Sequence, residues 1–151
     1  MTRRLFPVLL CILVMHPVHA DLLEGFQWQS RLLVLAAPSA DDPALRQQRE
    51  VIAKRDDAFI DRDLRVIELY GDRGLLDGQP ISNADLAGLR ARFRLAADDR
   101  VMILVGLDGG EKRRSSLTTP LSEVFLQIDG MPMRRAEIRA RRAAGEPVTP
   151  P

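Results

Sequence analysis

Two continuous apolar runs constrain the fold of this chain more than any other feature. Residues 31–38 read RLLVLAAP, and residues 100–107 read RVMILVGL. Runs of this length without polar alternation are typical of strands covered on both faces of a sheet. We therefore expect residues 31–37 and 101–107 to be adjacent, antiparallel and central strands.

The segments around these runs predict further strands and helices. Pro43, which follows two acids, suits the first turn of a helix, and Ser82 or Asn83 suits the cap of another. Glycines after Asp108 indicate a hairpin turn at 108–110. The expected elements are strands at 64–70 and 111–116, a loop at 71–81, and helices at 39–63 (broken near Asp56–Asp57), 84–95, 121–128 and from Pro132 to about Ala144.

The order of these elements predicts an α/β, thioredoxin-like domain with a four-stranded mixed sheet flanked by helices. The strands at 64–70 and 111–116 carry charged residues, so we expect them at the two edges. The predicted organisation is a lead-in at 21–30, a domain at 31–144 and a disordered, proline-rich tail at 145–151. Within the lead-in, Phe26 and Trp28 are expected to pack on the domain.

The first twenty residues have the layout of a signal peptide. Arg3 and Arg4 precede the apolar run LFPVLLCILVM, and VHA ends at Ala20, a suitable residue for cleavage. The apolar run is shorter than the about 20 residues that a membrane span needs. We therefore predict export to the periplasm or beyond, with no stable membrane span after cleavage. A retained N-terminal anchor is the alternative.

Cleavage after Ala20 would remove a large part of the chain's chemical repertoire. Cys11 is the single cysteine, and His16 and His19 are both of the histidines. A chain that begins at Asp21 contains no thiol and no imidazole, which excludes disulfides, Cys or Ser–His nucleophiles and His/Cys metal sites. We accordingly expect no cofactor and no metal.

Charge is unevenly distributed along the chain. Residues 21–110 contain 12 basic and 16 acidic groups, whereas residues 111–142 contain 8 basic and 4 acidic groups. The basic segment suits an acidic protein partner or a small anionic ligand, but solvated helix faces are the preferred explanation. Nucleic acid is not expected as a partner, because few aromatic side chains are present for base stacking.

The stretch IDGMPMRRAE at residues 128–137 is the most distinctive motif. Asp129 is expected to cap the helix that begins at Pro132, and Met131 and Met133 are expected to fill the core. Arg134 and Arg135 lie in the first helical turn, where the helix dipole disfavours cations.

Three explanations of these arginines remain open. They pair with acids such as Asp129, Asp108 or Glu137, they form a binding site for an anion together with Lys112, or they have no special role. The pairing with Asp129 is the preferred prediction. The candidate binding residues are Arg134, Arg135, Asp129, Asp108 and Lys112.

Two motifs together suggest a family. LVGLDGGEKRRSS, followed by IDGMPMRRAE, resembles the bacterial domain-of-unknown-function family 4174, which is related to the peroxiredoxin-like domains of sushi-repeat extracellular proteins and equarin. The resemblance covers about residues 30–142. It implies a thioredoxin-like fold in a secreted protein, with no established activity. Leu107 stands where the family is expected to have lysine, and Arg100 precedes a strand at the place where redox-active thioredoxins have a cis-proline.

The loop after the first strand bears on redox activity. Thioredoxin-like enzymes place reactive thiols there, at a helix N-terminus that lowers the thiol pKa. Here the loop is APSADD, residues 37–42, with Ser39 in place of a thiol and two acids beside it. The sequence therefore favours a non-catalytic binding module. The alternatives are a peroxiredoxin-like oxidoreductase relative that has lost its thiols and a carboxylate- or metal-dependent hydrolase, for which adjacent aspartates are poor clamps.

Overall fold

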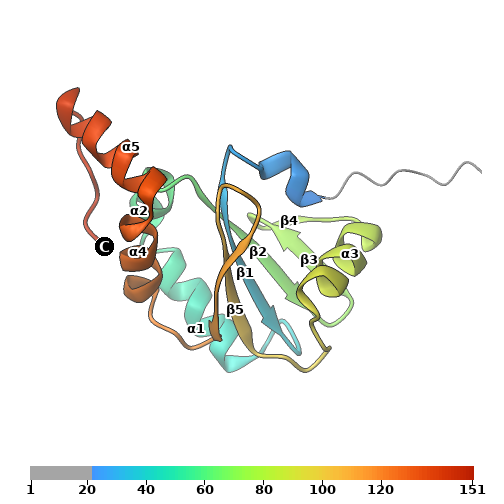
Figure 1. The fold of residues 1–151 in the computed structure, drawn as a ribbon. Helices are drawn as coiled ribbons and strands as arrows, with labels where there is room; N and C mark the ends of the chain where they lie inside the picture. The colour runs from blue at the N-terminus through green and yellow to red at the C-terminus, as the bar shows by residue number, and fades with distance from the viewer. Residues whose placement is uncertain (1–21) are drawn as a thin grey trace, which may run out of the picture.

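The structure is a computed structural model that describes residues 22–151, so the predicted signal peptide lies outside the described residues. A short 3-10 helix leads into one mixed sheet that helices cover on both faces (Figure 1). The helices are η1 (Leu22–Phe26), α1 (Pro43–Ile52), α2 (Asp56–Asp61), α3 (Asn83–Phe93), α4 (Leu121–Gly130) and α5 (Pro132–Ala143). The strands are β1 (Arg31–Ala37), β2 (Leu64–Tyr70), β3 (Arg73–Leu76), β4 (Gln79–Pro80), β5 (Val101–Val105) and β6 (Glu111–Ser116).

The two apolar runs form neighbouring inner strands, as predicted. The sheet order is β4-β3-β2-β1-β5-β6. Strand β1 is parallel to β2 and antiparallel to β5, with Leu33 opposite Leu104. All seven residues of β1 are buried, because helices cover both faces of the strand.

The sheet has six strands rather than the predicted four. The segment expected to be a loop at 71–81 forms β3 and β4, so β2 is an inner strand and not an edge. Asp77 and Gly78 form the turn between β3 and β4, both with positive φ, which is the conformation of a two-residue hairpin. The prediction missed this hairpin because its strands are short and only partly apolar.

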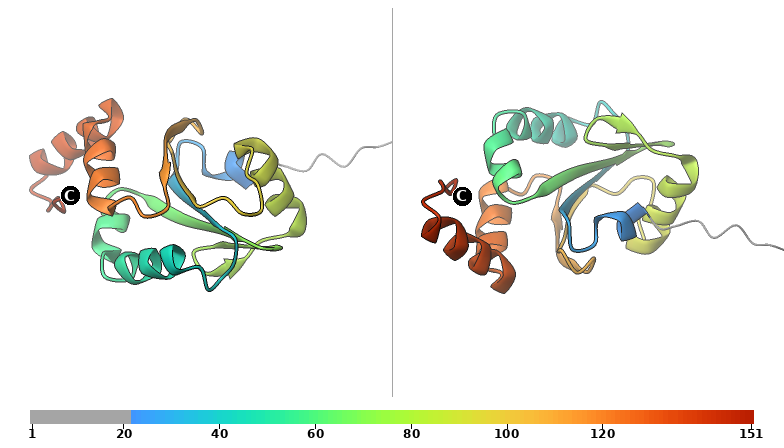
Figure 2. Two further views of the ribbon diagram at one scale, coloured as in Figure 1. Left: turned by 90° about the horizontal axis from the view of Figure 1, so that it is seen from below. Right: turned by 90° about the horizontal axis from the view of Figure 1, so that it is seen from above.

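Side chains of the inner strands alternate between two cores, as the two-residue period of a strand requires. Leu33 and Leu104 lie in the core under α1, α2 and α4, whereas Leu32 and Ile103 lie in the core under α3 and η1. Figure 2 shows these layers from two sides. The α1–α2 break falls at residues 53–55, close to its predicted place, and Ser82 caps α3.

Helix α5 extends from the end of α4 at one side of the domain (Figure 1). It contacts α4, and Arg134 is its buried residue. The tail after α5 has no helix or strand, and the carbonyl of Thr149 accepts a hydrogen bond from Arg62 at 3.1 Å. The attachment of α5 to the domain therefore involves a buried charged side chain, Arg134, which belongs to the motif at 128–137.

Candidate functional site

The motif forms the connection between α4 and α5. Met131 caps α5 with extended backbone, and Pro132 occupies the first helical position, as predicted. The prediction that Asp129 caps this helix is wrong, because no side chain caps it. The Asp129 carboxylate instead accepts hydrogen bonds from the guanidinium groups of Arg62, at 2.6 and 3.0 Å, and of Arg134, at 3.3 Å.

Arg134 is fully buried. It pairs with the carboxylate of Asp61, and its Nη1 donates to the Asp61 carbonyl at 2.6 Å and to Glu137 at 3.3 Å. Burial opposes ionisation, but the charge of Asp61 and the hydrogen bonds to Asp129 and Glu137 hold the pKa of Arg134 above its ordinary value. The structure thus pairs Arg134 with Asp129, and it adds Asp61 as a closer partner.

Two further arginines are buried beside Arg134. Arg31 donates to the Arg62 carbonyl at 2.8 Å and to Glu137 at 2.7 Å. These interactions join three arginines and three carboxylates into a network, here named the buried arginine cluster: Arg31, Arg62, Arg134, Asp61, Asp129 and Glu137. Arg141 pairs with Asp61 from the edge of this cluster at 2.5 Å.

The charged groups of the buried arginine cluster are paired with groups of opposite charge. A buried charge is tolerated when it is paired and hydrogen-bonded, and here three positive groups meet three negative groups. Burial opposes ionisation of Glu137, yet its hydrogen bonds to Arg31 and Arg134 hold its pKa below the ordinary value. The first-turn arginine that the helix dipole disfavours is therefore stabilised by tertiary ion pairs.

Arg135 has a different environment from its neighbour. Its side chain is exposed, and among the described residues it forms no hydrogen bond or ion pair. The two adjacent arginines of the motif therefore have separate roles: Arg134 holds α5 on the domain, and Arg135 faces solvent. Their predicted joint role in one anion site is not what the geometry shows.

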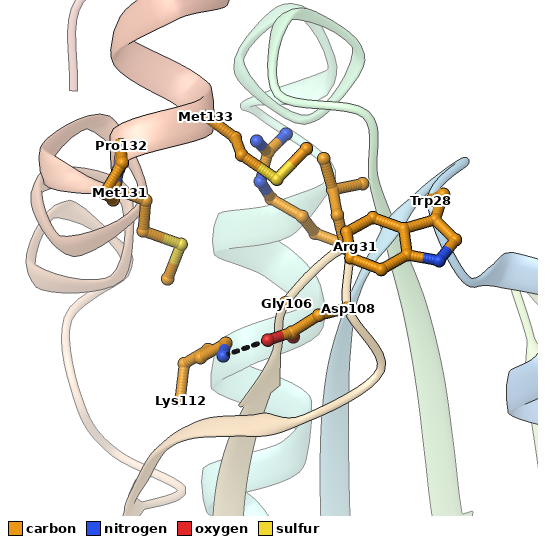
Figure 3. A pocket seen from close by; sticks show the side chains of 9 residues that line it. Trp28, Arg31, Gly106, Asp108, Lys112, Met131, Pro132 and Met133 are labelled. Carbon is orange, nitrogen blue, oxygen red and sulfur yellow. Dashed lines mark hydrogen bonds and ion pairs between the residues drawn. The ribbon is translucent and has the colours of Figure 1, made fainter.

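A pocket of about 300 Å³ lies beside the cluster and is named here the motif pocket (Figure 3). Its lining joins the lead-in, the start of β1, the β5–β6 turn and the start of α5. The residues are Trp28, Arg31, Gly106, Leu107, Asp108, Lys112, Met131, Pro132 and Met133. Of the predicted site residues, Asp108 and Lys112 line this pocket, whereas Arg134 and Asp129 lie in the buried arginine cluster and Arg135 lies outside both.

Asp108 and Lys112 form an ion pair across the β5–β6 turn, at 2.6 Å. Asp108 also accepts from the Gly110 backbone N–H at 3.0 Å. The hydrogen bonds from Lys112 and Gly110 keep the pKa of Asp108 below its ordinary value. Gly106 makes room for this arrangement, because a Cβ there would come within 2.6 Å of Lys112 Cε.

Trp28 and Met133 remain exposed at the pocket, so the predictions that they pack on the domain or fill its core are wrong. Trp28 is 62% exposed and Met133 is 48% exposed. The Trp28 backbone N–H nevertheless donates to the Leu107 carbonyl at 2.6 Å, and Gln27 donates to the Asp108 carbonyl at 3.1 Å. The lead-in is thus held against the turn while the indole stays in solvent.

Arg31 belongs to both the cluster and the motif pocket. Its Nη1 and Nη2 atoms are hydrogen-bonded, but its buried Nε has no hydrogen-bond partner. A buried donor without a partner costs about 1–3 kcal/mol. Sequence reasoning missed Arg31 because it opens an apolar strand, and the sequence carries no local signal for its partner Glu137, which lies 106 positions away.

The loop at the other end of β1, where thioredoxin-like enzymes place their thiols, holds a closed ion pair. Asp42 caps α1 by accepting from the backbone N–H groups of Ala44, at 3.0 Å, and Leu45, at 3.4 Å. Arg100 donates to the same carboxylate at 2.7 Å. Burial opposes ionisation of Asp42, but the hydrogen bonds from Arg100, Leu45 and Ala44 hold its pKa below the ordinary value.

Ser39 is exposed in this loop. No group of three potential metal-ligating residues gathers anywhere within 22–151. The helices of that same region are all too short or too polar to cross a bilayer.

Comparison with solved structures places the fold. The reduced 2-Cys peroxiredoxin of Plasmodium vivax superposes with a TM-score of 0.55 at 14% identity, over 75% of this chain and 83% of that chain. The mitochondrial 2-Cys peroxiredoxin of Plasmodium falciparum gives 0.51 at 14% identity, over 86% and 87%. These similarities confirm the predicted α/β, thioredoxin-like fold.

The curated sequences that match include two distant relatives. The Sushi repeat-containing protein SRPX of Rattus norvegicus is 31% identical over 132 residues, which cover 84% of this chain and 28% of that protein. Coiled-coil domain-containing protein 80 of Danio rerio is 25% identical over 142 residues, which cover 83% and 16%. The chain therefore spans less than a third of the length of either relative.

The part of the chain that builds the sheet, the motif pocket and the first half of α5 also carries the family signature. The model of the Domain of unknown function (DUF4174) matches residues 22–137. That range includes both the glycine-containing turn and the IDGMPMRRAE motif, and it is most of the sequence. The chain belongs to the DUF4174 family.

Proposed function

We propose that this protein is an exported, non-catalytic binding module whose binding site is the motif pocket. One observation carries the proposal: residues of both sequence motifs and of the lead-in meet at a pocket with an exposed tryptophan and an exposed methionine. Large apolar side chains beside a few polar groups in a concave site are typical of binding sites.

The loop at residues 38–42 supports the non-catalytic part of the proposal. Residues 21–151 contain no cysteine, and the α1 N-terminal N–H groups that would stabilise a thiolate are bonded to Asp42. A carboxylate at that position also repels a second negative charge. The loop is therefore unsuited to the thiol chemistry of its structural neighbours.

Export is supported by the signal-like pattern of residues 1–20 and by the relationship to a sushi repeat-containing protein. Material recovered from outside the cytoplasm should begin at Asp21. Intact mass spectrometry tests this expectation. A mass that retains Met1 to Ala20 would show an anchored protein that keeps Cys11.

Partner capture with matched variants tests the site. Immobilised protein is exposed to an extract of exported proteins, and retained proteins are compared between wild type and Trp28→Ala. The control is Leu126→Ala, since Leu126 is 60% exposed and is not among the pocket's lining residues. We expect retention by wild type and by the control, and loss with Trp28→Ala. Equal retention by all three would place binding elsewhere.

The alternative is a peroxiredoxin-like oxidoreductase relative that has lost its thiols, which the peroxiredoxin-like fold favours. Ser39→Cys introduces a thiol at the loop. Because Asp42 occupies the helix N-terminus, we expect this thiol to have a pKa at or above the ordinary value of about 8.5. The pH dependence of its alkylation by iodoacetamide measures this pKa, with Ser39→Cys/Asp42→Asn as the control. A strongly lowered pKa would favour the redox ancestry.

A further inference from the structure

The walls of the motif pocket are apolar and adaptable. Trp28 offers an aromatic surface, and Met131 and Met133 offer flexible thioethers that repack around different shapes. A volume of about 300 Å³ is at the small end of ligand sites. It suits one large apolar side chain and the main chain next to it, rather than a cofactor.

Arg31, which lines the pocket, has a free hydrogen-bond donor that suits an uncharged acceptor on a ligand. The Arg31 side chain is 99% buried, since its exposed fraction is 1%, and its Nε–H has no partner. The charge of Arg31 is already balanced by Glu137 at 2.7 Å. In the view of Figure 3, the Met133 side chain passes in front of the Arg31 guanidinium. Movement of this flexible side chain would give a carbonyl oxygen access to the unpaired donor.

The rim adds a charged group with spare donors. Lys112 uses one hydrogen bond to Asp108, at 2.6 Å, and an ammonium group has three donors. Its side chain is 34% exposed. An acid on the ligand would therefore pair with Lys112, in competition with Asp108.

An apolar side chain, an adjacent carbonyl and a nearby acid occur together in a peptide. We propose that the motif pocket binds an extended peptide segment with a large apolar residue followed by an acidic residue. The apolar side chain lies between Trp28 and Met133, a backbone carbonyl accepts from Arg31 Nε, and the acid pairs with Lys112. This inference rests on the proposed function and specifies the ligand of that same pocket.

Trp28 is the single tryptophan of the chain, so its fluorescence reports directly on the pocket. The probes are the capped peptides acetyl-Gly-Phe-Glu-Gly-amide and the same peptide with Ala for Phe or Gln for Glu. We expect a saturable fluorescence change with the Phe-Glu peptide below about 1 mM, the weak end of specific affinity. The Ala peptide should give no saturation, and the Gln peptide should bind several-fold more weakly.

Variants assign each contact. Lys112→Gln should remove the preference for Glu over Gln, whereas Lys54→Gln, at the chain's other lysine, should leave it unchanged. Asp108→Asn keeps an acceptor for the Gly110 N–H but releases Lys112, so it should strengthen binding of the Phe-Glu peptide. Met133→Ala should weaken binding of every Phe-containing peptide.

Peptide binding and partner capture separate the two proposals. If no peptide saturates the Trp28 signal, or if the Phe and Ala peptides bind equally, the peptide inference is wrong. If capture nevertheless depends on Trp28, the binding module stands with a ligand of another chemical class. If neither peptide binding nor Trp28-dependent partner capture is observed, the proposed function is wrong as well.

Discussion

The two ends of β1 differ in how their polar groups are satisfied. At the carboxyl end, Asp42 is bonded to two backbone N–H groups and to Arg100. At the amino end, Arg31 retains an unpaired Nε beside a pocket with an exposed tryptophan. At the end that a thioredoxin-like enzyme would use for chemistry, Asp42 already accepts hydrogen bonds from the helix N–H groups and from Arg100. At the opposite end, Arg31 Nε has a hydrogen-bond donor that no group of the protein uses.

This difference shows that the residues that determine the fold are distinct from the residues that could form a binding site. The sheet requires only that β1 be apolar on both faces, and it places no demand on the residues at either end. Asp42 satisfies a helix terminus and leaves no donor for a ligand. The buried arginine cluster instead pairs Arg31 through Nη1 and Nη2 and leaves its buried Nε without a partner. A binding site on this domain is therefore expected at the amino end of β1.

The largest expected effect comes from the cluster beneath the pocket. Arg134→Ala leaves the buried carboxylate of Asp61 without its closest partner and should destabilise the domain by about 3–5 kcal/mol. Arg135→Ala, one residue away in solvent, should change the free energy of unfolding by less than about 0.5 kcal/mol. Urea denaturation measures both. Similar values for the two variants would contradict the assignment of separate roles.

The next largest effect on stability is expected in the core of the sheet, between the two ends of β1. Leu33 and Leu104 lie opposite each other in the sheet and are 0% and 1% exposed. Replacing either by Ala should cost about 2–5 kcal/mol, because the cavity cannot fully close between packed helices and sheet. Thermal or urea unfolding provides the measurement. A cost below that range would show that the core under α1 and α4 collapses around the gap.

The carboxyl end of β1 should contribute less, and its contribution should depend on pH. Asp42→Ala removes a helix cap and should cost about 0.5–2 kcal/mol. The folded pKa of Asp42 lies below its ordinary value, so its ionic contribution to stability is present above the unfolded pKa and is lost as the pH falls through the folded pKa. Asp42→Asn keeps a cap and should show a weaker dependence of stability on pH in the acid range. Parallel acid-unfolding curves would contradict this.

The smallest stability effect should be at the motif pocket. Trp28→Ala removes a side chain that is 62% exposed, and its backbone hydrogen bond to Leu107 remains. We expect a change within about 0.5 kcal/mol, together with the loss of partner capture described above. A large destabilisation would mean that the indole has a structural role, and it would weaken the comparison between the two ends.

Part of this organisation follows from the sequence alone. Continuous apolar runs identified β1 and β5 as neighbouring inner strands, because a strand covered on both faces cannot alternate. Pro43, Ser82 and Pro132 indicated where α1, α3 and α5 begin, because capping chemistry is local. The lack of a thiol after residue 20 also needs no structure.

Tertiary structure decided the rest. The β3–β4 hairpin, the burial of Arg31 and Arg62 and the exposure of Trp28 and Met133 were not predicted. Burying a charge depends on partners that the fold brings together, such as Glu137 for Arg31, and no local period in the sequence reports such a pairing. The motif pocket has the same origin: its walls come from three segments of the chain, residues 28–31, 106–112 and 131–133, and packing of α5 through Arg134 brings the last of them to the others.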